Sequence, residues 1–287
     1  MKKYPLSVVI NTLNEEKNLR NCLETVKWAE EIVIVDMYSD DNTVPIAREY
    51  TGRIFFHERM GYADPARQFA LDQASHEWVL SLDADELVPP PLKERLLAIM
   101  QNDQAGLVYL PHNNYFFGHL MQGTSWGALQ DKHPRFYKKK FVRYSETVHD
   151  IFRIVNNPRV LSVGDPREGF IHFNYIDVEH FLDKLNRYTT IEAKNIFAGQ
   201  KEDISAGKML YKAAREFLRR FIVRKGYKDG AQGLYLSCLM AAYHVSTFAK
   251  IRLMKRFQSQ SPREEIEKLY AQIAAGIIAE YRNHEGK

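Results

Sequence analysis

The sequence predicts an α/β protein in which a mostly parallel sheet is flanked by helices and followed by a helical C-terminal extension. Two observations predict the sheet: short β-branched and aromatic runs of strand length recur in the N-terminal part, and a helix-like stretch follows each run. A third observation predicts the extension, because helical periodicity returns near residue 178 and continues from there.

Four runs are expected to form the parallel strands, at residues 6–12, 31–36, 53–57 and 77–83. After the first run, Leu19, Leu23 and Val26 share one helical face, and Asn14 is the expected N-cap of that helix. Further helices are expected over residues 43–50, 65–74 and 91–100. Strands that alternate with helices pair in parallel, and such sheets bind ligands beyond the carboxyl ends of their strands.

From Gly106 onward the pattern changes to aromatic, strand-like pieces at residues 107–111 and 115–117. Residues 135–137 and 141–144 resemble the two arms of a hairpin across three lysines, and helices are expected over residues 178–197, 205–224 and 234–257. This change of texture divides the chain: we expect residues 1–176 to form the main domain and residues 177–287 to form a helical, basic region.

The composition indicates a folded protein of the cytoplasm. With 287 residues, of which 45% are hydrophobic, the chain can bury a substantial core, which excludes a disordered or fibrous protein. Cys22 and Cys238 are far apart in the sequence and show no spacing typical of disulfides. The N-terminus lacks the apolar segment and cleavage site of a secretory signal.

Positive charge is concentrated in residues 205–258, which hold twelve Lys and Arg against Glu216 and Asp229. Such a segment suits an anionic partner, either membrane headgroups or nucleic acid, although solvated helix faces give the same pattern. No nucleic-acid-binding module is recognisable, so we expect no nucleic acid among the partners. Residues 230–249 carry no Lys, Arg, Asp or Glu, but their polar residues favour a buried or interfacial helix over a membrane span.

Asp83-Ala84-Asp85-Glu86 directly follows the fourth expected strand and is the strongest chemical signal in the sequence. Two carboxylates separated by one residue can both reach a ligand there, and a hard divalent cation with diphosphate oxygens is a suitable ligand. An isolated triplet of this kind is more often a solvated surface turn. The other strand ends favour the functional interpretation here.

Polar segments also follow the first two expected strands, Asn11-Thr12-Leu13-Asn14-Glu15 after the first and Asp36 to Thr43 after the second. At the edge that Asp83 shares, these side chains can hydrogen-bond a nucleobase and ribose. Each segment alone is explained by helix capping, but capping does not explain three polar strand ends in order.

These motifs resemble those of family 2 inverting glycosyltransferases of the GT-A fold, and more closely the bacterial lipopolysaccharide-core β-glucosyltransferase group. The resemblance covers nearly the whole chain and is strongest in the first hundred residues. The matching residues are Asn11 to Glu15, Val35-Asp36 with Ser39 and Asp41 to Thr43, Ala66-Arg67-Gln68, Leu82 to Glu86, Arg135-Phe136-Tyr137, Val148-His149-Asp150, and Ile171-His172-Phe173 leading into Lys184 to Tyr188.

The resemblance implies a nucleotide-sugar site, with a UDP-sugar as donor and Mg²⁺ or Mn²⁺ as cofactor. Residues 1–105 would form the nucleotide-binding half and residues 106–176 the acceptor-side half. Thr12, Glu15 and Asp36 would hold the nucleobase, with Asn14 and Ser39 from the same segments. Arg67 would steady the nucleotide, while Asp83, Ala84 and Asp85 would face the ribose and the metal-bound diphosphate, with Asp83 and Asp85 as metal ligands.

An inverting transfer needs one base to take the proton of the attacking hydroxyl. The segment from Glu146 to Asp150 offers two carboxylates, and we expect Asp150 to be the base, with Glu146 as second candidate. Asp150 stands where the related group often has glutamate, and ordinary strand-surface charge is the competing explanation. His149 or His172 could complete the metal shell, although a lone histidine is more often structural.

The sequence therefore predicts an inverting hexosyltransferase that moves glucose or a similar sugar from a UDP-sugar to an envelope glycan or lipid-linked glycan. It would work in the cytoplasm, with docking on an anionic membrane at the inner face of the cytoplasmic membrane as an added expectation. A non-catalytic carbohydrate- or membrane-binding protein is one alternative. A sugar nucleotidyltransferase is another, but residues 11–20 lack the glycine-rich loop that binds a triphosphate.

Overall fold

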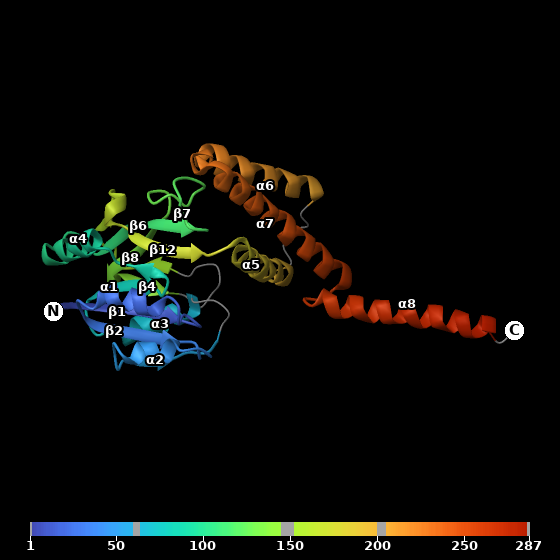
Figure 1. Cartoon of the computed structure of the whole chain (residues 1–287), viewed down its shortest axis with the longest axis horizontal. Coiled ribbons are helices and arrows are strands. Elements are labelled where there is room, and N and C mark those ends of the chain that lie inside the picture. The colour runs from blue at the N-terminus through green and yellow to red at the C-terminus, as the bar shows by residue number, and fades with distance from the viewer. Residues whose placement is uncertain (1, 60–63, 145–151, 200–204, 286–287) are drawn as a thin grey trace. The chain divides into compact units, whose positions relative to one another are not determined.

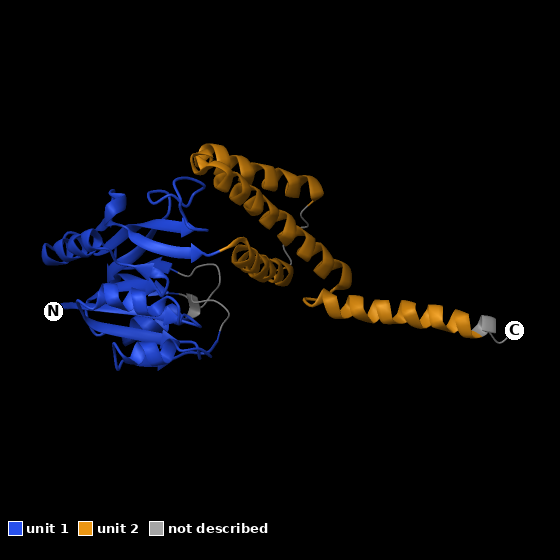
Figure 2. Ribbon diagram, in the orientation of Figure 1, with its two compact units in different colours: residues 1–176 blue, residues 177–287 orange. Residues whose placement is uncertain are grey.

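The computed structural model describes residues 2–59, 64–144, 152–199 and 205–285. The chain divides into two compact units, Met1–Ile176 and Asp177–Lys287 (Figure 2). The expected α/β fold with a helical C-terminal part is confirmed, since unit 1 is a sheet flanked by helices and unit 2 is helical (Figure 1).

Unit 1 is built on a ten-stranded mixed sheet with the main order β3-β2-β1-β4-β8-β6-β12-β5. The first four strands in this order pair in parallel, whereas β8 runs antiparallel to both of its neighbours. β12 is parallel to β6 and antiparallel to β5, and β7 and β11 pair with β6 outside the main path. The strands are β1 (Tyr4–Thr12), β2 (Ala29–Asp36), β3 (Ile54–Phe56), β4 (Trp78–Asp83), β5 (Glu86–Leu87), β6 (Leu107–Phe116), β7 (His119–Leu120), β8 (Lys132–Lys138), β11 (Val160–Ser162) and β12 (Phe170–Tyr175).

Both faces of the parallel part are covered, which explains why its strands are continuous apolar runs. Along β1, Val8 and Ile10 join one core cluster and Val9 joins the other, as the alternation of a strand requires. Helix α1 (Leu19–Val26) and helix α4 (Pro90–Gln101) pack on the first face, and α3 (Asp64–Gln73) packs on the second. Helix α2 (Thr43–Arg48) follows β2.

Two local expectations are wrong. β8 and β9 (Val142–Tyr144) do not form a hairpin, because β8 pairs with β4 and β6 while β9 pairs with β10 (Phe152–Ile154). A short 3₁₀ turn, η1 (Lys139–Phe141), separates them. Asn14 does not cap α1, whose N-cap position is Asn18; Asn14 lies upstream with a φ of 57°.

The described residues of unit 2 form four long helices: α5 (Val178–Ala198), α6 (Ala206–Leu218), α7 (Gly230–Phe257) and α8 (Pro262–Glu285). Side-chain caps from Asp177 and Ser205 start α5 and α6. The connection from α6 to α7 is a π turn, η3 (Arg219–Val223), followed by a 3₁₀ turn, η4 (Gly226–Asp229). None of the helices in the described part of the chain is long and apolar enough to cross a membrane.

Candidate active site

The carboxyl ends of β1, β2 and β4 meet at one edge of the sheet. Thr12 pairs with Asp36 in the β1–β2 register, and Asn11 pairs with Asp83 in the β1–β4 register. Because neighbouring residues of a strand alternate, the Thr12 and Asp36 side chains extend on one face of the sheet and Asp83 on the other. The edge thus carries two polar clusters on either side of β1.

The first cluster centres on the buried carboxylate of Asp36. The Thr12 hydroxyl donates to its Oδ1 at 2.8 Å, the Ser39 hydroxyl donates to the same oxygen at 2.6 Å, and the Ser39 amide donates to Oδ2 at 2.7 Å. A carboxylate that accepts three bonds at the end of two strands fixes the loop after β2 against β1.

The loop after β1 is tied to the same neighbours. The Asn14 amide donates to the Ser39 hydroxyl at 2.8 Å, and the Asn14 side-chain oxygen accepts from the Asp40 amide at 2.8 Å. The Glu15 amide donates to the Thr43 hydroxyl at 2.7 Å. The polar segments that capping alone could have explained therefore bond to each other across the two strand ends.

The second cluster holds Asp83 between two arginines. Arg67 from α3 donates to Oδ1 at 2.8 Å, and Arg135 from β8 donates to Oδ2. Burial alone would raise the pKa of Asp83, but Arg135 and Arg67 outweigh it and hold that pKa well below its usual range. Asp83 is thus a fixed anion.

Glu86 holds the backbone of Asp83 in place and is fully buried. The turn through Ala84 and Asp85 brings its carboxylate back to accept from the Asp83 amide at 2.8 Å. Arg135 donates to the other oxygen of Glu86 at 3.1 Å, and His112 Nε2 lies 3.0 Å from that oxygen. Burial favours the neutral imidazole and lowers the pKa of His112, while Arg135 helps to hold the pKa of Glu86 at about 2 against the effect of burial.

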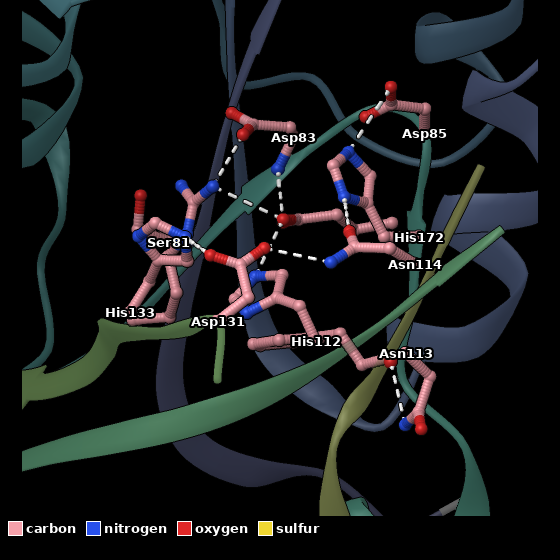
Figure 3. Close-up of polar contacts among 12 residues, drawn as sticks. Ser81, Asp83, Asp85, His112, Asn113, Asn114, Asp131, His133 and His172 are labelled. Atoms are coloured by element: carbon pink, nitrogen blue, oxygen red, sulfur yellow. Dashed lines mark hydrogen bonds and ion pairs between the residues drawn. The ribbon is translucent and has the colours of Figure 1, made fainter. Parts of the chain in front are cut away.

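Asp85 faces a different partner, His172 from β12, whose Nε2 lies 3.6 Å from Asp85 Oδ2 (Figure 3). The other ring nitrogen, Nδ1, lies 2.7 Å from the side-chain oxygen of Asn114. The amide nitrogen of Asn114 donates to Asp131 and to the Trp126 carbonyl, which leaves its oxygen as the acceptor for His172. This contact places a proton on Nδ1 and turns Nε2 toward Asp85.

The family model described as "Glycosyl transferase family 2" matches residues 7–153, which include both clusters. The chain belongs to glycosyltransferase family 2. This family 2 glycosyltransferase is 29% identical over 259 residues to the lipopolysaccharide core biosynthesis glycosyltransferase LpsC of Rhizobium meliloti, a match that covers 87% of this chain and 92% of LpsC. It is 26% identical to the uncharacterized glycosyltransferase RT0209 of Rickettsia typhi, with 88% and 87% of the two chains covered.

Among solved structures, the crystal structure of residues 1–349 of S. aureus TarS is similar to this glycosyltransferase at a TM-score of 0.46 and 17% identity. The similarity covers 95% of this chain and 92% of that one.

Some expected site residues lie outside the described residues, namely Glu146, His149 and Asp150. Among the residues that the structure does describe, no three His, Cys, Asp or Glu side chains form a metal-binding cluster. Asp85 and His172 are nevertheless chemically suited to a cation, because a carboxylate oxygen and the Nε2 atom of an imidazole lie 3.6 Å apart. Burial opposes protonation of His172, but Asp85 raises its pKa above the usual value, so a cation at this point would take the place of a ring proton. Few protein ligands suffice when substrate phosphates supply the others.

Sequence reasoning did not assign roles to the residues that hold the two aspartates in place. Glu86, His112 and Asn114 are buried, and Arg135 is nearly so. The signal for two of them was present, since His112 and Asn114 occupy alternate positions of strand β6, in line with the apolar Leu110 and Phe116. Polar side chains on the inward face of a strand indicate a buried network.

Proposed function

We propose that this glycosyltransferase transfers a hexose, glucose in the first instance, from a UDP-sugar to a hydroxyl of an envelope glycan or lipid-linked glycan, with inversion at the anomeric carbon. One observation carries the proposal: Asp36 and Asp83 lie at the same edge of the sheet, one strand on either side of β1. Ligands of such sheets bind at that edge.

The donor's nucleoside would lie across the two loops that are bonded to each other. Thr12, Glu15 and Asp36 would hold the nucleobase, with Asn14 and Ser39 keeping the loops in register. Since Asp36 already accepts from Thr12 and Ser39, its orientation is set before the nucleotide arrives. We assign residues 1–105 to this nucleotide-binding half and residues 106–176 to the acceptor side.

The ribose and diphosphate would meet Asp83, Ala84 and Asp85, next to Arg67. Both oxygens of Asp83 accept from guanidinium groups, so we expect Asp83 to act as a fixed anion near the ribose. Asp85 and His172 would hold Mg²⁺ or Mn²⁺. A cation there would offset the negative charge that develops on the departing UDP.

The chain's own carboxylates would complete the transfer. Asp150, or Glu146 as second candidate, would take the proton from the acceptor hydroxyl as its oxygen attacks the anomeric carbon. One such base is enough for an inverting reaction, because the acceptor itself displaces UDP.

The proposed acceptor class is supported by the relative in Rhizobium meliloti, which is named for lipopolysaccharide core biosynthesis and matches over most of both chains. We propose the same class of acceptor for this glycosyltransferase. Its place would be the cytoplasm, at the inner face of the cytoplasmic membrane where a lipid-linked acceptor is presented.

The test is release of UDP from UDP-glucose, with lipopolysaccharide core acceptor, in the presence of Mg²⁺, Mn²⁺ or a chelator. Wild type should show metal-stimulated release, Asp85→Ala and Asp150→Ala should lose most of it, and Glu264→Ala on α8 is the matched surface control. The anomeric configuration of the product, read by NMR, should be inverted.

Two outcomes would contradict the proposal at different levels. If no UDP-sugar gives metal-stimulated release with any core acceptor, the proposed donor and acceptor are wrong. If Asp85→Ala is inactive while Asp150→Ala keeps full activity, the donor site stands and Asp150 is not the base, which would move the assignment to Glu146.

A further inference from the structure

The turn between α6 and α7, together with the outward face of α6, carries an unusual number of exposed apolar side chains within unit 2. We call this surface the hairpin face and define it by Leu210, Tyr211, Leu218, Ile222, Val223 and Tyr227. Each of these side chains is at least half exposed, with Val223 at 69% and Tyr211 at 65%. Figure 1 shows α6 lying along α7, joined to it at this turn.

Helix geometry explains why these side chains point outward. On α6, Ala213 and Glu216 are the residues that turn inward and are buried. Leu210, Ala214 and Leu218 follow one another at four-residue spacing and therefore form a stripe on another side of the helix. This stripe also lines an apolar groove of about 500 Å³ that includes Cys238 and Ala241 of α7.

The turn at the end of the hairpin is held in a fixed shape. Gly233 packs so closely on the turn that a Cβ there would lie 1.9 Å from the carbonyl oxygen of Gly226. Glu216 accepts from Arg219 at 2.8 Å and from Arg220 at 2.6 Å. Ile222, Val223 and Tyr227 are therefore presented by an ordered turn.

Exposed basic side chains alternate with the apolar ones along this segment of the chain. Lys208, Lys225 and Lys228 are exposed, and none of the three has a carboxylate partner among the described residues. Lys212 and Arg215 add two more exposed positive charges on α6. Apolar side chains bordered by unpaired Lys and Arg are the composition of a helix that lies in the interface of an anionic bilayer.

We infer that the hairpin face docks on a bilayer that contains anionic phospholipids, with Ile222, Val223 and Tyr227 entering the interface and the flanking lysines contacting headgroups. This deepens the membrane location in the proposed function, and it does not depend on which sugar is transferred. Docking would hold the enzyme on the surface that carries a lipid-linked acceptor.

A second copy of the chain fits this face less well. Five exposed positive charges around one apolar stripe would repel the same charges of a facing copy. Helix α8 offers the contrast: it also exposes apolar side chains, including Ile273 and Ile277, but its charges are of both signs and form pairs such as Arg263 with Glu267. Charge complementarity to an anionic surface therefore distinguishes the hairpin face from α8.

The chain carries its own reporter for the test. Cys238 is exposed and lines the groove, whereas Cys22 is buried and its thiol pKa is raised by burial. A charged, water-soluble maleimide should therefore modify Cys238 in the free protein. Vesicles of phosphatidylethanolamine and phosphatidylglycerol should slow this reaction roughly tenfold, and vesicles of phosphatidylcholine alone should not.

Substitutions on the hairpin face test which of its residues bind the vesicles. In vesicle co-sedimentation, Lys208→Gln/Lys225→Gln/Lys228→Gln should weaken binding by well over tenfold, at about fivefold for each charge. Ile222→Ser/Val223→Ser should weaken it roughly tenfold. Ile273→Ser/Ile277→Ser on α8 is the matched control and should bind as wild type does. The lysine variant keeps every apolar contact, so it serves if the serine variant fails to fold.

Four outcomes would overturn the inference: equal binding to neutral and anionic vesicles, no binding to either, equal loss in the α8 control, or maleimide protection that depends on protein concentration without vesicles. The last would show that a second copy covers the hairpin face. Release of UDP from UDP-glucose with a soluble acceptor should be unchanged in all these variants, so failure of docking is distinguishable from failure of the proposed function.

Discussion

The pairing of Arg135 with Glu86 gives the sharpest test of the site's electrostatics. Arg135 bridges Asp83 and Glu86, with a side chain only 14% exposed, while Glu86 is fully buried. Removing one partner of a buried ion pair costs about 3–5 kcal/mol, because the other charge is left uncompensated. Arg135→Met and Glu86→Gln should each lower the free energy of unfolding of unit 1 by about that amount.

The quantity that tests this pairing is the coupling free energy between the two substitutions. If they acted independently, the double variant would lose about 6–10 kcal/mol, which is comparable to the whole stability of a typical domain. Because the double variant leaves neither charge alone, since Arg67 still pairs with Asp83, we expect a loss smaller by about 2 kcal/mol. The double variant should therefore lose about 4–8 kcal/mol rather than about 6–10 kcal/mol.

The assay is urea unfolding followed by tryptophan fluorescence, since Trp28, Trp78 and Trp126 are all in unit 1 and report on it alone. Arg20 and Glu49 provide the control, because they form a two-bond ion pair at 2.5 and 2.6 Å with both side chains about half exposed. The corresponding cycle of Arg20→Met and Glu49→Gln should show much weaker coupling. Additive losses in the buried pair, or equal coupling in both pairs, would refute this account of the site.

Three further predictions concern other parts of the molecule. Asp83→Asn should lower the free energy of unfolding of unit 1 by about 3 kcal/mol, because two guanidinium groups lose their shared anion. Asp85→Asn should leave urea unfolding almost unchanged and should remove metal-stimulated UDP release. Equal destabilisation by the two variants would contradict this division of roles. Burial opposes ionisation of Glu216, but Arg219 and Arg220 lower its pKa to about 2, so its contribution to unit 2 is present above pH 4.5 and is lost as the pH falls toward 2. Far-UV circular dichroism should show that loss in wild type and a flatter profile in Glu216→Gln. Gly233→Ala should destabilise unit 2 by about 2 kcal/mol, because the added Cβ would clash with the backbone of Gly226. The added Cβ of Gly276→Ala in α8 would have no atom within 4 Å, so this variant should not be destabilised. Thermal unfolding measures both.

Most of the parallel half of the sheet could be predicted from the sequence because β1, β2 and β4 are buried on both faces, whereas the edge strand β3 is only partly buried. The strand expected at 77–83 is observed as β4 at 78–83, one residue shorter. The helix expected at 91–100 is observed as α4 at 90–101, one residue longer at each end. Continuous apolar runs leave little freedom in where such a strand begins and ends.

The antiparallel half could not be predicted, because its pairing joins segments that are far apart in the sequence. β6 lies between β8 and β12, and β5 pairs with β12. The three lysines suggested a local hairpin, but β8 gains two buried neighbours by pairing with β4 and β6 instead. Pairing between remote strands depends on the assembled core, and local periodicity does not record it.

For the site, the sequence indicated which strand ends carry polar residues but not how those residues partner. Asp83 and Asp85 are equivalent as two carboxylates of one triplet. Only the fold shows that α3 and β8 bring arginines to the first, and that β12 brings a histidine to the second. These partners come from three segments that no spacing rule connects.

This difference between the two aspartates has a consequence for the chemistry. Asp83 and Glu86 carry two negative charges, and Arg67 and Arg135 carry two positive charges, so the buried cluster is neutral without Asp85. Asp85 is then the carboxylate whose charge is not met by a guanidinium, and a neutral His172 would leave it unbalanced. A positive charge beside Asp85, whether a proton on His172 or a divalent cation, would stabilise that carboxylate. Under the proposed function, a cation there would also attract a diphosphate to the edge where Arg67 already lies, so the neutral cluster would fix the geometry while the charge at Asp85 would change with the ligand.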